Sequence, residues 1–262
     1  MQHIRRRSGG VALAFIPTTR RKFRPPRRGA HFSLSFIAPY RPLMLITFEG
    51  IDGSGKSTHA RLLVEHFERS GRLPLLVREP GGTELSERIR ALLLDPAAHI
   101  TPRAELLLFS AARAHLVDEA VRPALAEGRV VIADRFYDST TAYQGAGRGI
   151  ADPDWLRDFH AFVTDGLTPD RTYFIDVPLE AAAARRGGDR DRMEGAGAAF
   201  FERVRTAYQQ LAEAEPGRFV VLDGRQSVEA LHAAIVRDVE ALLAAEASGT
   251  ARSASGSSPD DL

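Results

Sequence analysis

The 262-residue chain contains no cysteine. This absence excludes a disulfide framework, a zinc site built from thiolates and a thiol nucleophile. The sequence also lacks any apolar run near the roughly 18 residues that a membrane-spanning helix needs, so no membrane association is expected. Its eight histidines show no metal-ligand spacing, so no zinc site is predicted.

Acidic residues are missing from the first 43 positions, which carry ten lysines and arginines. The net charge of +1 therefore hides an asymmetry, because the rest of the chain has 25 basic and 34 acidic residues, or about −9. Since the positive charge is confined to this leader, the remaining chain does not resemble a nucleic-acid binder, and we expect no nucleic-acid partner for it.

Three interpretations of the leader, residues 1–43, stay open. Its arginine- and serine-rich composition is typical of an organellar presequence. It could also be a basic arm for RNA or anionic lipid, or the product of a start codon assigned upstream of Met44. We favour the last, because Met44 directly precedes the first predicted strand. A cytoplasmic location follows as the expectation, and residues 246–262, rich in Ser, Gly and Ala, are predicted to be disordered.

Between these ends, apolar strands alternate with helical patterns. The predicted strands are 45–50, 73–79, 129–135, 171–177 and 218–224, and the main helices are 83–95, 103–127 (interrupted near Pro123), 152–164, 200–214 and 227–245. Continuous apolar strands separated by helices predict an α/β fold, with a five-stranded parallel sheet flanked by helices on both faces. The predicted domain is 44–245, and Trp155 is expected to anchor its helix by packing.

A phosphate-binding motif lies between the first strand and the first helix. Residues 50–57, GIDGSGKS, fit G-x-x-x-x-G-K-[ST] in the context that this motif requires. Backbone N–H groups and a helix N-terminus would face phosphate oxygens, Lys56 would reach the β- and γ-phosphates, and Ser57 would bind Mg²⁺. The predicted ATP-binding residues are Gly50, Ile51, Asp52, Gly53, Ser54, Gly55, Lys56, Ser57 and Thr58.

A second charged pair follows the third strand at Asp134-Arg135. Ligands bind at the carboxyl ends of strands in open α/β sheets, so this position is a candidate site. Asp134 would hold Mg²⁺ partly through water, and the planar fork of Arg135 would clamp an acceptor phosphate. No N-K-x-D segment of a GTPase is present, and a small-molecule kinase is the class that remains.

Several longer motifs make the resemblance specific. REPGGTELSERIRALLLD, FSAARAHL, DRFYDSTTAYQGAGRGI and a DRME segment resemble thymidylate kinase, over Met44 to about Leu243. The resemblance implies a nucleoside-monophosphate-kinase fold and transfer of the γ-phosphoryl group of ATP to dTMP, with Mg²⁺, in dTTP synthesis. It also implies a homodimer and a lid at about 185–197.

The resemblance further implies roles for individual residues. Phe109 would stack on thymine, Arg113 would hydrogen-bond the base, and Gln144 with Thr140 would read its edge and reject cytosine. Arg90 and Arg135 would hold the 5′-phosphate. The full predicted dTMP set is Asp52, Glu79, Arg90, Phe109, Arg113, Arg135, Thr140, Tyr143 and Gln144, with Asp52 beside the sugar, Glu79 walling it and Tyr143 crowding the ribose 2′ position. The Glu79–Pro80 bond is predicted to be cis.

The predicted catalytic residues are Lys56, Asp52 and Arg135, together with one lid arginine. One branch of the family carries a catalytic arginine in the P-loop, where this chain has Gly53 and Ser54. The lid stretch RRGGDRDRME would therefore supply it, and the candidates in order are Arg186, Arg190 and Arg192.

Overall fold

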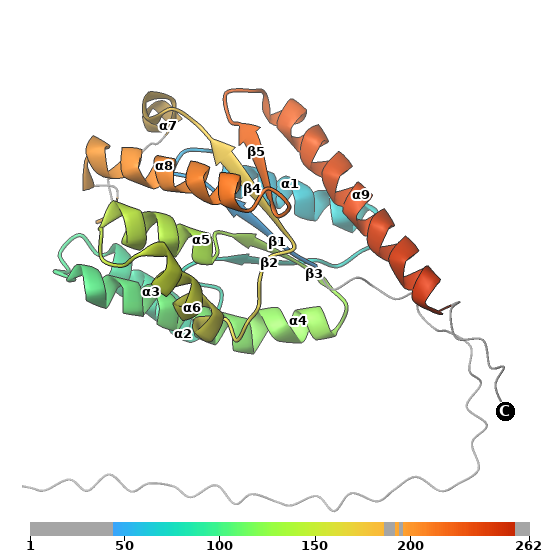
Figure 1. Cartoon of the computed structure of the whole chain (residues 1–262), viewed down its shortest axis with the longest axis horizontal. Coiled ribbons are helices and arrows are strands. Elements are labelled where there is room, and N and C mark those ends of the chain that lie inside the picture. The colour runs from blue at the N-terminus through green and yellow to red at the C-terminus, as the bar shows by residue number, and fades with distance from the viewer. Residues whose placement is uncertain (1–43, 186–191, 194–195, 255–262) are drawn as a thin grey trace, which may run out of the picture. The chain divides into compact units, whose positions relative to one another are not determined.

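The computed structural model describes residues 44–185, 192–193 and 196–254, drawn in colour in Figure 1. Two of the predicted lid arginines, Arg186 and Arg190, lie outside these residues, as does the leader. No helix among the described residues combines the length and hydropathy that crossing a bilayer requires.

Five parallel strands form one sheet at the centre, and this confirms the predicted fold class. Their order across the sheet is β2-β3-β1-β4-β5. The strands are β1 (Met44–Glu49), β2 (Leu75–Arg78), β3 (Val130–Asp134), β4 (Arg171–Asp176) and β5 (Phe219–Asp223). Every residue of β1 and β3 is buried, which explains why these strands read as unbroken apolar runs in the sequence.

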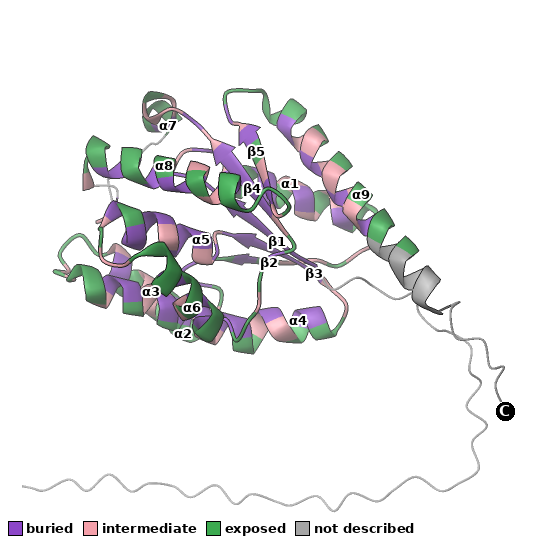
Figure 2. Cartoon of the chain, in the orientation of Figure 1, coloured by how far each residue is buried: buried purple, intermediate pink, exposed green. Residues whose placement is uncertain are grey.

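Helices cover both faces of this sheet (Figures 1 and 2). α1 (Lys56–Arg69) and α9 (Val228–Ala254) contact each other on one face, where Met44, Ile46 and Phe48 of β1 join their core. The intervening Leu45 packs on the opposite face, as the two-residue period of a strand requires. The remaining helical segments are α2 (Glu84–Leu94), α3 (Pro102–Leu116), η1 (Val117–Val121), α4 (Arg122–Ala126), α5 (Tyr137–Thr140), η2 (Thr141–Gly147), α6 (Pro153–Val163), α7 (Leu179–Arg185) and α8 (Ala198–Ala214).

Three helical features differ from the sequence prediction. The run α3–η1–α4 is not interrupted at Pro123, because the wider π turn η1 comes directly before it and accommodates a residue without a backbone N–H. The segment α5–η2, in which no helix was predicted, is helical. α9 continues to Ala254, past the expected start of the disordered tail at 246.

The strand register brings the charged ends of three strands to one edge of the sheet. Phe48 of β1 and Arg78 of β2 both pair with Asp134 of β3. Glu49, Arg78 and Asp134, each the last residue of its strand, therefore lie together, next to the loop that leads into α1. Polar side chains therefore lie together at the carboxyl edge of the sheet, where a ligand was expected.

A buried ion pair fastens α5 to the sheet. Arg218, just before β5, donates to both carboxylate oxygens of Asp138 at 2.7 and 2.9 Å, and the two side chains are only 10% and 1% exposed. Removing one partner of such a pair leaves an uncompensated charge in the interior.

We therefore expect Arg218→Ala to lower the free energy of unfolding by about 3–5 kcal/mol, measured by urea denaturation. Glu215→Ala is the matched control, because Glu215 binds the same guanidinium but is 48% exposed. It should cost less than about 1 kcal/mol. Equal losses in the two variants would contradict this account of the pair.

Candidate functional site

The loop between β1 and α1 is shaped by glycines that no other residue can replace without strain. Gly50 has φ of 137°, and a Cβ there would lie 2.6 Å from the carbonyl oxygen of Ile175. Gly55 has φ of 105° and directly precedes α1. The loop therefore wraps tightly at the N-terminus of a helix, where backbone N–H groups are available to an anion.

Lys56 lies under this loop. Its Nζ donates to the carbonyl of Ile51 at 2.8 Å and is 3.9 Å from Asp52 Oδ1. Burial, reinforced by the nearby charge of Arg135, lowers the pKa of Lys56 to about 8 despite the opposing pull of Asp52. The lysine is thus a cation at neutral pH, and the backbone carbonyl of Ile51 fixes it against the loop.

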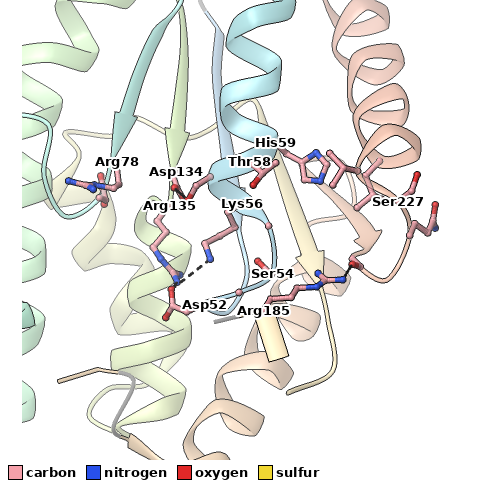
Figure 3. Close-up of a pocket in the computed structure, with 18 of the residues that line it drawn as sticks. Asp52, Ser54, Lys56, Thr58, His59, Arg78, Asp134, Arg135, Arg185 and Ser227 are labelled. Carbon is pink, nitrogen blue, oxygen red and sulfur yellow. Dashed lines mark hydrogen bonds and ion pairs between the residues drawn. The ribbon is translucent and has the colours of Figure 1, made fainter. Parts of the chain in front are cut away.

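A cavity of about 590 Å³ opens over the loop (Figure 3). This volume lies in the range of small-ligand sites. Predicted residues that line it are Asp52, Gly53, Ser54, Gly55, Lys56, Ser57, Thr58, Glu79, Arg90, Asp134 and Arg135. Gly50 and Ile51 do not line it, but their carbonyl oxygens accept from Arg135 and Lys56. Ser57 Oγ donates to Asp134 Oδ2 at 2.5 Å, so the end of β3 meets the start of α1.

Arg135 is the most heavily bonded residue in the site. It donates to Asp52 Oδ1 at 2.6 Å, to Gly50 O at 3.0 Å and to the hydroxyl of Tyr143 at 3.1 Å. Its backbone has φ of 76°, an unfavourable value for a residue with a Cβ. Burial alone would raise the pKa of Asp52, but Arg135 and Lys56 outweigh it and hold that pKa well below its usual value.

A second cavity lies beside the first. Its lining includes Phe109 of α3 and Thr140, Tyr143 and Gln144 of the α5–η2 segment, all predicted from the sequence. Four side chains line both cavities: Asp52, Glu79, Arg90 and Arg135. The two spaces therefore meet at a pair of arginines and a pair of carboxylates.

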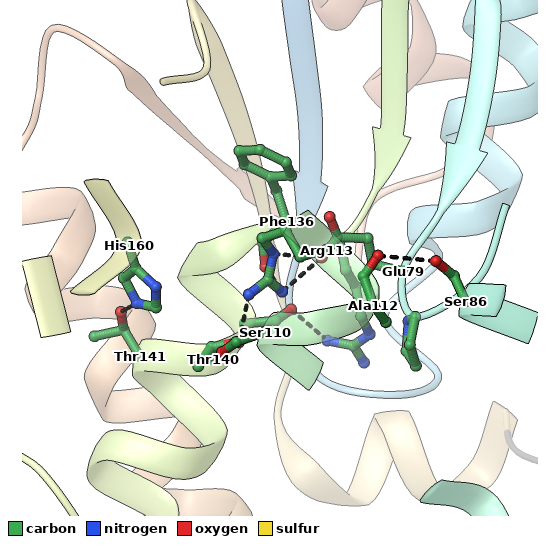
Figure 4. Close-up of polar contacts among 12 residues, drawn as sticks. Glu79, Ser86, Ser110, Ala112, Arg113, Phe136, Thr140, Thr141 and His160 are labelled. Atoms are coloured by element: carbon green, nitrogen blue, oxygen red, sulfur yellow. Dashed lines mark hydrogen bonds and ion pairs between the residues drawn. The ribbon is translucent and has the colours of Figure 1, made fainter. Parts of the chain in front are cut away.

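Arg113 lines neither cavity, although a direct contact with a base was predicted for it. Figure 4 shows its guanidinium directed at neighbouring protein groups. It donates to Glu79 Oε2 at 2.6 Å, Thr140 Oγ1 at 2.9 Å and Phe136 O at 3.1 Å, and its side chain is 2% exposed. Arg113 thus positions two residues that line the second cavity. The Glu79–Pro80 bond is cis, as predicted.

Arg192 also differs from its predicted place. The third candidate for the catalytic lid arginine lines neither cavity, and it donates to Glu105 Oε2 at 2.6 Å and to Leu93 O at 2.8 Å. Glu105 also accepts from Gln144 at 2.9 Å and from both Nε and an Nη of Arg148 at 3.1 Å. Arg192 and Met193, two described residues of the lid, therefore lie on the side of the second cavity.

Sequence reasoning missed part of the first cavity. Its outer wall includes His59, Arg185, Gln226 and Ser227 of the loop after β5, and Val228, the first residue of α9. Arg185 donates to Gly224 O at 2.9 Å, so the end of α7 is joined to that loop. The position of this loop beyond the carboxyl end of β5 was a usable signal, because the same strand ends carry the rest of the site.

A P-loop on this strand order, with a second cavity meeting it at two arginines, defines a P-loop phosphotransferase of the nucleoside-monophosphate-kinase type. The family model described as thymidylate kinase matches residues 48–235. The thymidylate kinase of Chlorobium luteolum is 51% identical over 205 residues, which cover 74% of this chain and 95% of that protein.

The thymidylate kinase of Bifidobacterium longum strain DJO10A is 46% identical, over 76% of this chain and 98% of its own length. A crystal structure of thymidylate kinase from Ehrlichia chaffeensis matches with a TM-score of 0.62 at 36% identity, over 75% of this chain and 98% of the other. The chain belongs to the thymidylate kinase family.

Glu49, at the end of β1, supports Arg135 through two hydroxyl groups that lie between them. It accepts from Phe136 N at 2.7 Å, Ser139 Oγ at 2.6 Å and Tyr208 OH at 2.7 Å, and these two hydroxyls also contact Arg135. Burial, followed by the negative charge of Asp138, raises the pKa of Glu49 from 4.5 to about 7.

This shift predicts a pH-dependent stability. Between about pH 4.5 and 7 the folded protein keeps a proton on Glu49 that the unfolded chain loses, so the free energy of unfolding falls as pH rises through this window. As pH rises through this window, the free energy of unfolding should decline on the order of a few kcal/mol, and Glu49→Gln should remove this decline. Urea denaturation at pH 5 and pH 8 measures it, and an unchanged difference between the two pH values in the variant would contradict the assignment.

Proposed function

We propose that this protein transfers the γ-phosphoryl group of ATP to dTMP, giving ADP and dTDP for dTTP synthesis. The observation that carries this proposal is the meeting of two cavities at Arg90 and Arg135, one cavity built on a P-loop and the other bordered by Phe109, Thr140 and Gln144. A donor and an acceptor bound in these cavities would place their phosphates at the same pair of cations.

ATP is proposed to occupy the larger cavity, with its phosphates on the loop of residues 50–58. Ser54 supports this placement, because its hydroxyl is buried and has no partner among the described residues, as expected of a group reserved for a ligand. Lys56 would reach the β- and γ-phosphates from beneath the loop.

The residues present fit Mg²⁺. Ser57 and Asp134 bring two oxygen ligands to 2.5 Å of each other beside the loop, and Mg²⁺ prefers few protein oxygens together with phosphate and water. The described residues include no group of three His, Asp or Glu that could hold a metal, which suits an ion held largely by its nucleotide. When bound, Mg²⁺ would neutralise charge on the phosphates.

The acceptor is proposed to lie in the second cavity. Phe109 is half-buried at its edge and can stack on thymine, a contact worth about 1–3 kcal/mol in other proteins. Arg90 and Arg135 would bind the 5′-phosphate. Glu79 Oε1 is buried without a partner among the described residues, which suits a sugar hydroxyl that donates to it. Asp52 would lie beside the sugar and phosphate, and Tyr143 would close the ribose 2′ side.

The chemistry then depends on position and charge rather than on a protein nucleophile. The acceptor phosphate oxygen attacks the γ-phosphorus, and the bond to the ADP oxygen breaks. Lys56 and Arg135 lie where negative charge builds up on the transferring group. A lid arginine, Arg186 or Arg190, remains the predicted third cation. The cytoplasmic location and the 44–245 domain also stay predictions.

Lys56→Ala or Arg135→Ala should lower dTMP-dependent ADP formation by about 100-fold or more, since each removes a cation from the reacting phosphates. A coupled ADP assay measures the loss, and circular dichroism checks that the fold survives. Arg157→Ala is the control, because Arg157 is 72% exposed and pairs only with exposed acids among the described residues. Near-normal turnover in either site variant would sink the proposal.

We also propose a homodimer that uses α3 and α6, which contact each other. Trp155, expected to pack inside, is instead 48% exposed and stacks on Phe159, because it lies on the outer side of α6. Leu107 and Phe162 are 54% and 83% exposed on the same helices. Exposed apolar side chains grouped on neighbouring helices favour a protein partner.

Light scattering after gel filtration tests this interface. The wild-type chain should elute as a dimer, and the double variant Leu107→Glu with Trp155→Glu should elute as a monomer, because it buries two charges at the contact. Leu73→Glu, at a leucine before β2 that is 70% exposed and lies on neither helix, should stay dimeric. A monomeric wild type at micromolar concentration would exclude the proposed dimer.

A further inference from the structure

Glu105 is a buried carboxylate that the proposed reaction does not use. It lies in the first turn of α3, is 1% exposed, and receives donors from two other segments of the chain. Gln144 Nε2 donates to its Oε1 at 2.9 Å, Arg148 donates to both of its oxygens at 3.1 Å, and Arg192 donates to its Oε2 at 2.6 Å. Only Gln144 in this cluster lines the second cavity.

The charge state of Glu105 follows from these contacts. Burial alone would raise its pKa, but the hydrogen bonds from Arg148, Gln144 and Arg192 together outweigh burial and lower it. Glu105 is therefore a carboxylate at neutral pH, and a carboxylate can only accept hydrogen bonds.

An acceptor-only partner determines the orientation of the Gln144 amide. Turning the amide by 180° would put its carbonyl oxygen against a carboxylate oxygen, with no proton between them. It would also lose a charge-assisted hydrogen bond. The nitrogen end of Gln144 must therefore face Glu105, and the carbonyl oxygen is the end left for the cavity.

We propose that Glu105 is a specificity-determining positioning residue, which presents the carbonyl oxygen of Gln144 to the pyrimidine base. This inference rests on the proposed binding of dTMP beside Gln144. Thymine carries an N3–H donor that this oxygen accepts, whereas cytosine carries an unprotonated N3 whose lone pair it repels. Discrimination between the two bases is then set by a residue that touches neither of them.

Arg148 and Arg192 have a supporting part in this arrangement. Arg148 shares Oε1 with Gln144 and also donates to Oε2, Arg192 donates to Oε2, and together they keep the carboxylate ionised inside the protein. Arg148 is 22% exposed and its guanidinium lies 4.8 Å from the centre of the Phe200 ring, so its position does not depend on Glu105 alone. Arg148→Lys keeps a cation beside the carboxylate and removes neither partner of the Glu105–Gln144 hydrogen bond, so it is a matched control.

The test compares kcat/KM for dTMP, dCMP and dUMP in the full chain. In Glu105→Gln the facing group can donate as well as accept, so the Gln144 amide can turn over. The preference for dTMP over dCMP should fall about tenfold or more. The preference for dTMP over dUMP should stay within about twofold, because both bases present the same N3–H edge. Arg148→Lys should keep both preferences.

If Glu105→Gln does not fold, Glu105→Asp provides the same test. The aspartate keeps the negative charge, and the long side chains of the two arginines can still reach it. Because aspartate is one methylene shorter, its carboxylate lies farther from Gln144. The preference for dTMP over dCMP should therefore again fall. A folded variant that keeps the wild-type preference overturns the inference. So does a parallel change in both preferences, which indicates a distorted pocket. A wild-type chain that forms no ADP with dTMP would instead refute the proposed function.

Discussion

The ion pair between Arg135 and Asp52 joins the two halves of the site. Asp52 belongs to the loop after β1, and Arg135 follows β3, so the pair exists only because these strands are neighbours in a parallel sheet. The guanidinium borders both cavities and is bonded to the loop, to Tyr143 and to the support built on Glu49. Its left-handed backbone is kept in place by these contacts, since an isolated residue would relax to a more favourable φ.

The surroundings of this pair are unusually polar for a protein interior. Glu79 with Arg113, and Glu105 with its two arginines, repeat the same arrangement of a buried carboxylate and a guanidinium. Buried ion pairs contribute little net stability, because desolvation offsets their attraction. What they supply is geometry, since one member of each pair orients a side chain that lines a cavity. Arg113 does this for Thr140, and Glu105 does it for Gln144.

The elements that could be predicted are those whose signal is local. The five strands and the P-loop depend on short runs of sequence and were placed correctly, whereas the cis bond before Pro80 was expected from the family resemblance. The contacts of Arg113 and Arg192 with buried acids could not be predicted, because the sequence around an arginine does not tell whether it contacts a ligand or a distant carboxylate. Their acids are distant in the chain, Glu79 for the first and Glu105 for the second. The helical segment α5–η2 was missed for the same reason, since its π turns and its tie to Arg218 are tertiary features.

The sharing of Asp52, Glu79, Arg90 and Arg135 between two cavities has a consequence for anion binding. Asp52 lies 2.6 Å from Arg135 and 3.9 Å from Lys56, so the arginine has a counter-ion within the protein. A small monovalent anion would have to displace a carboxylate to bind there. A phosphate ester, with two charges and several oxygens, can compete for the fork of the arginine. Asp52, the built-in counter-ion of Arg135, thus disfavours weakly binding anions independently of any contact with a base.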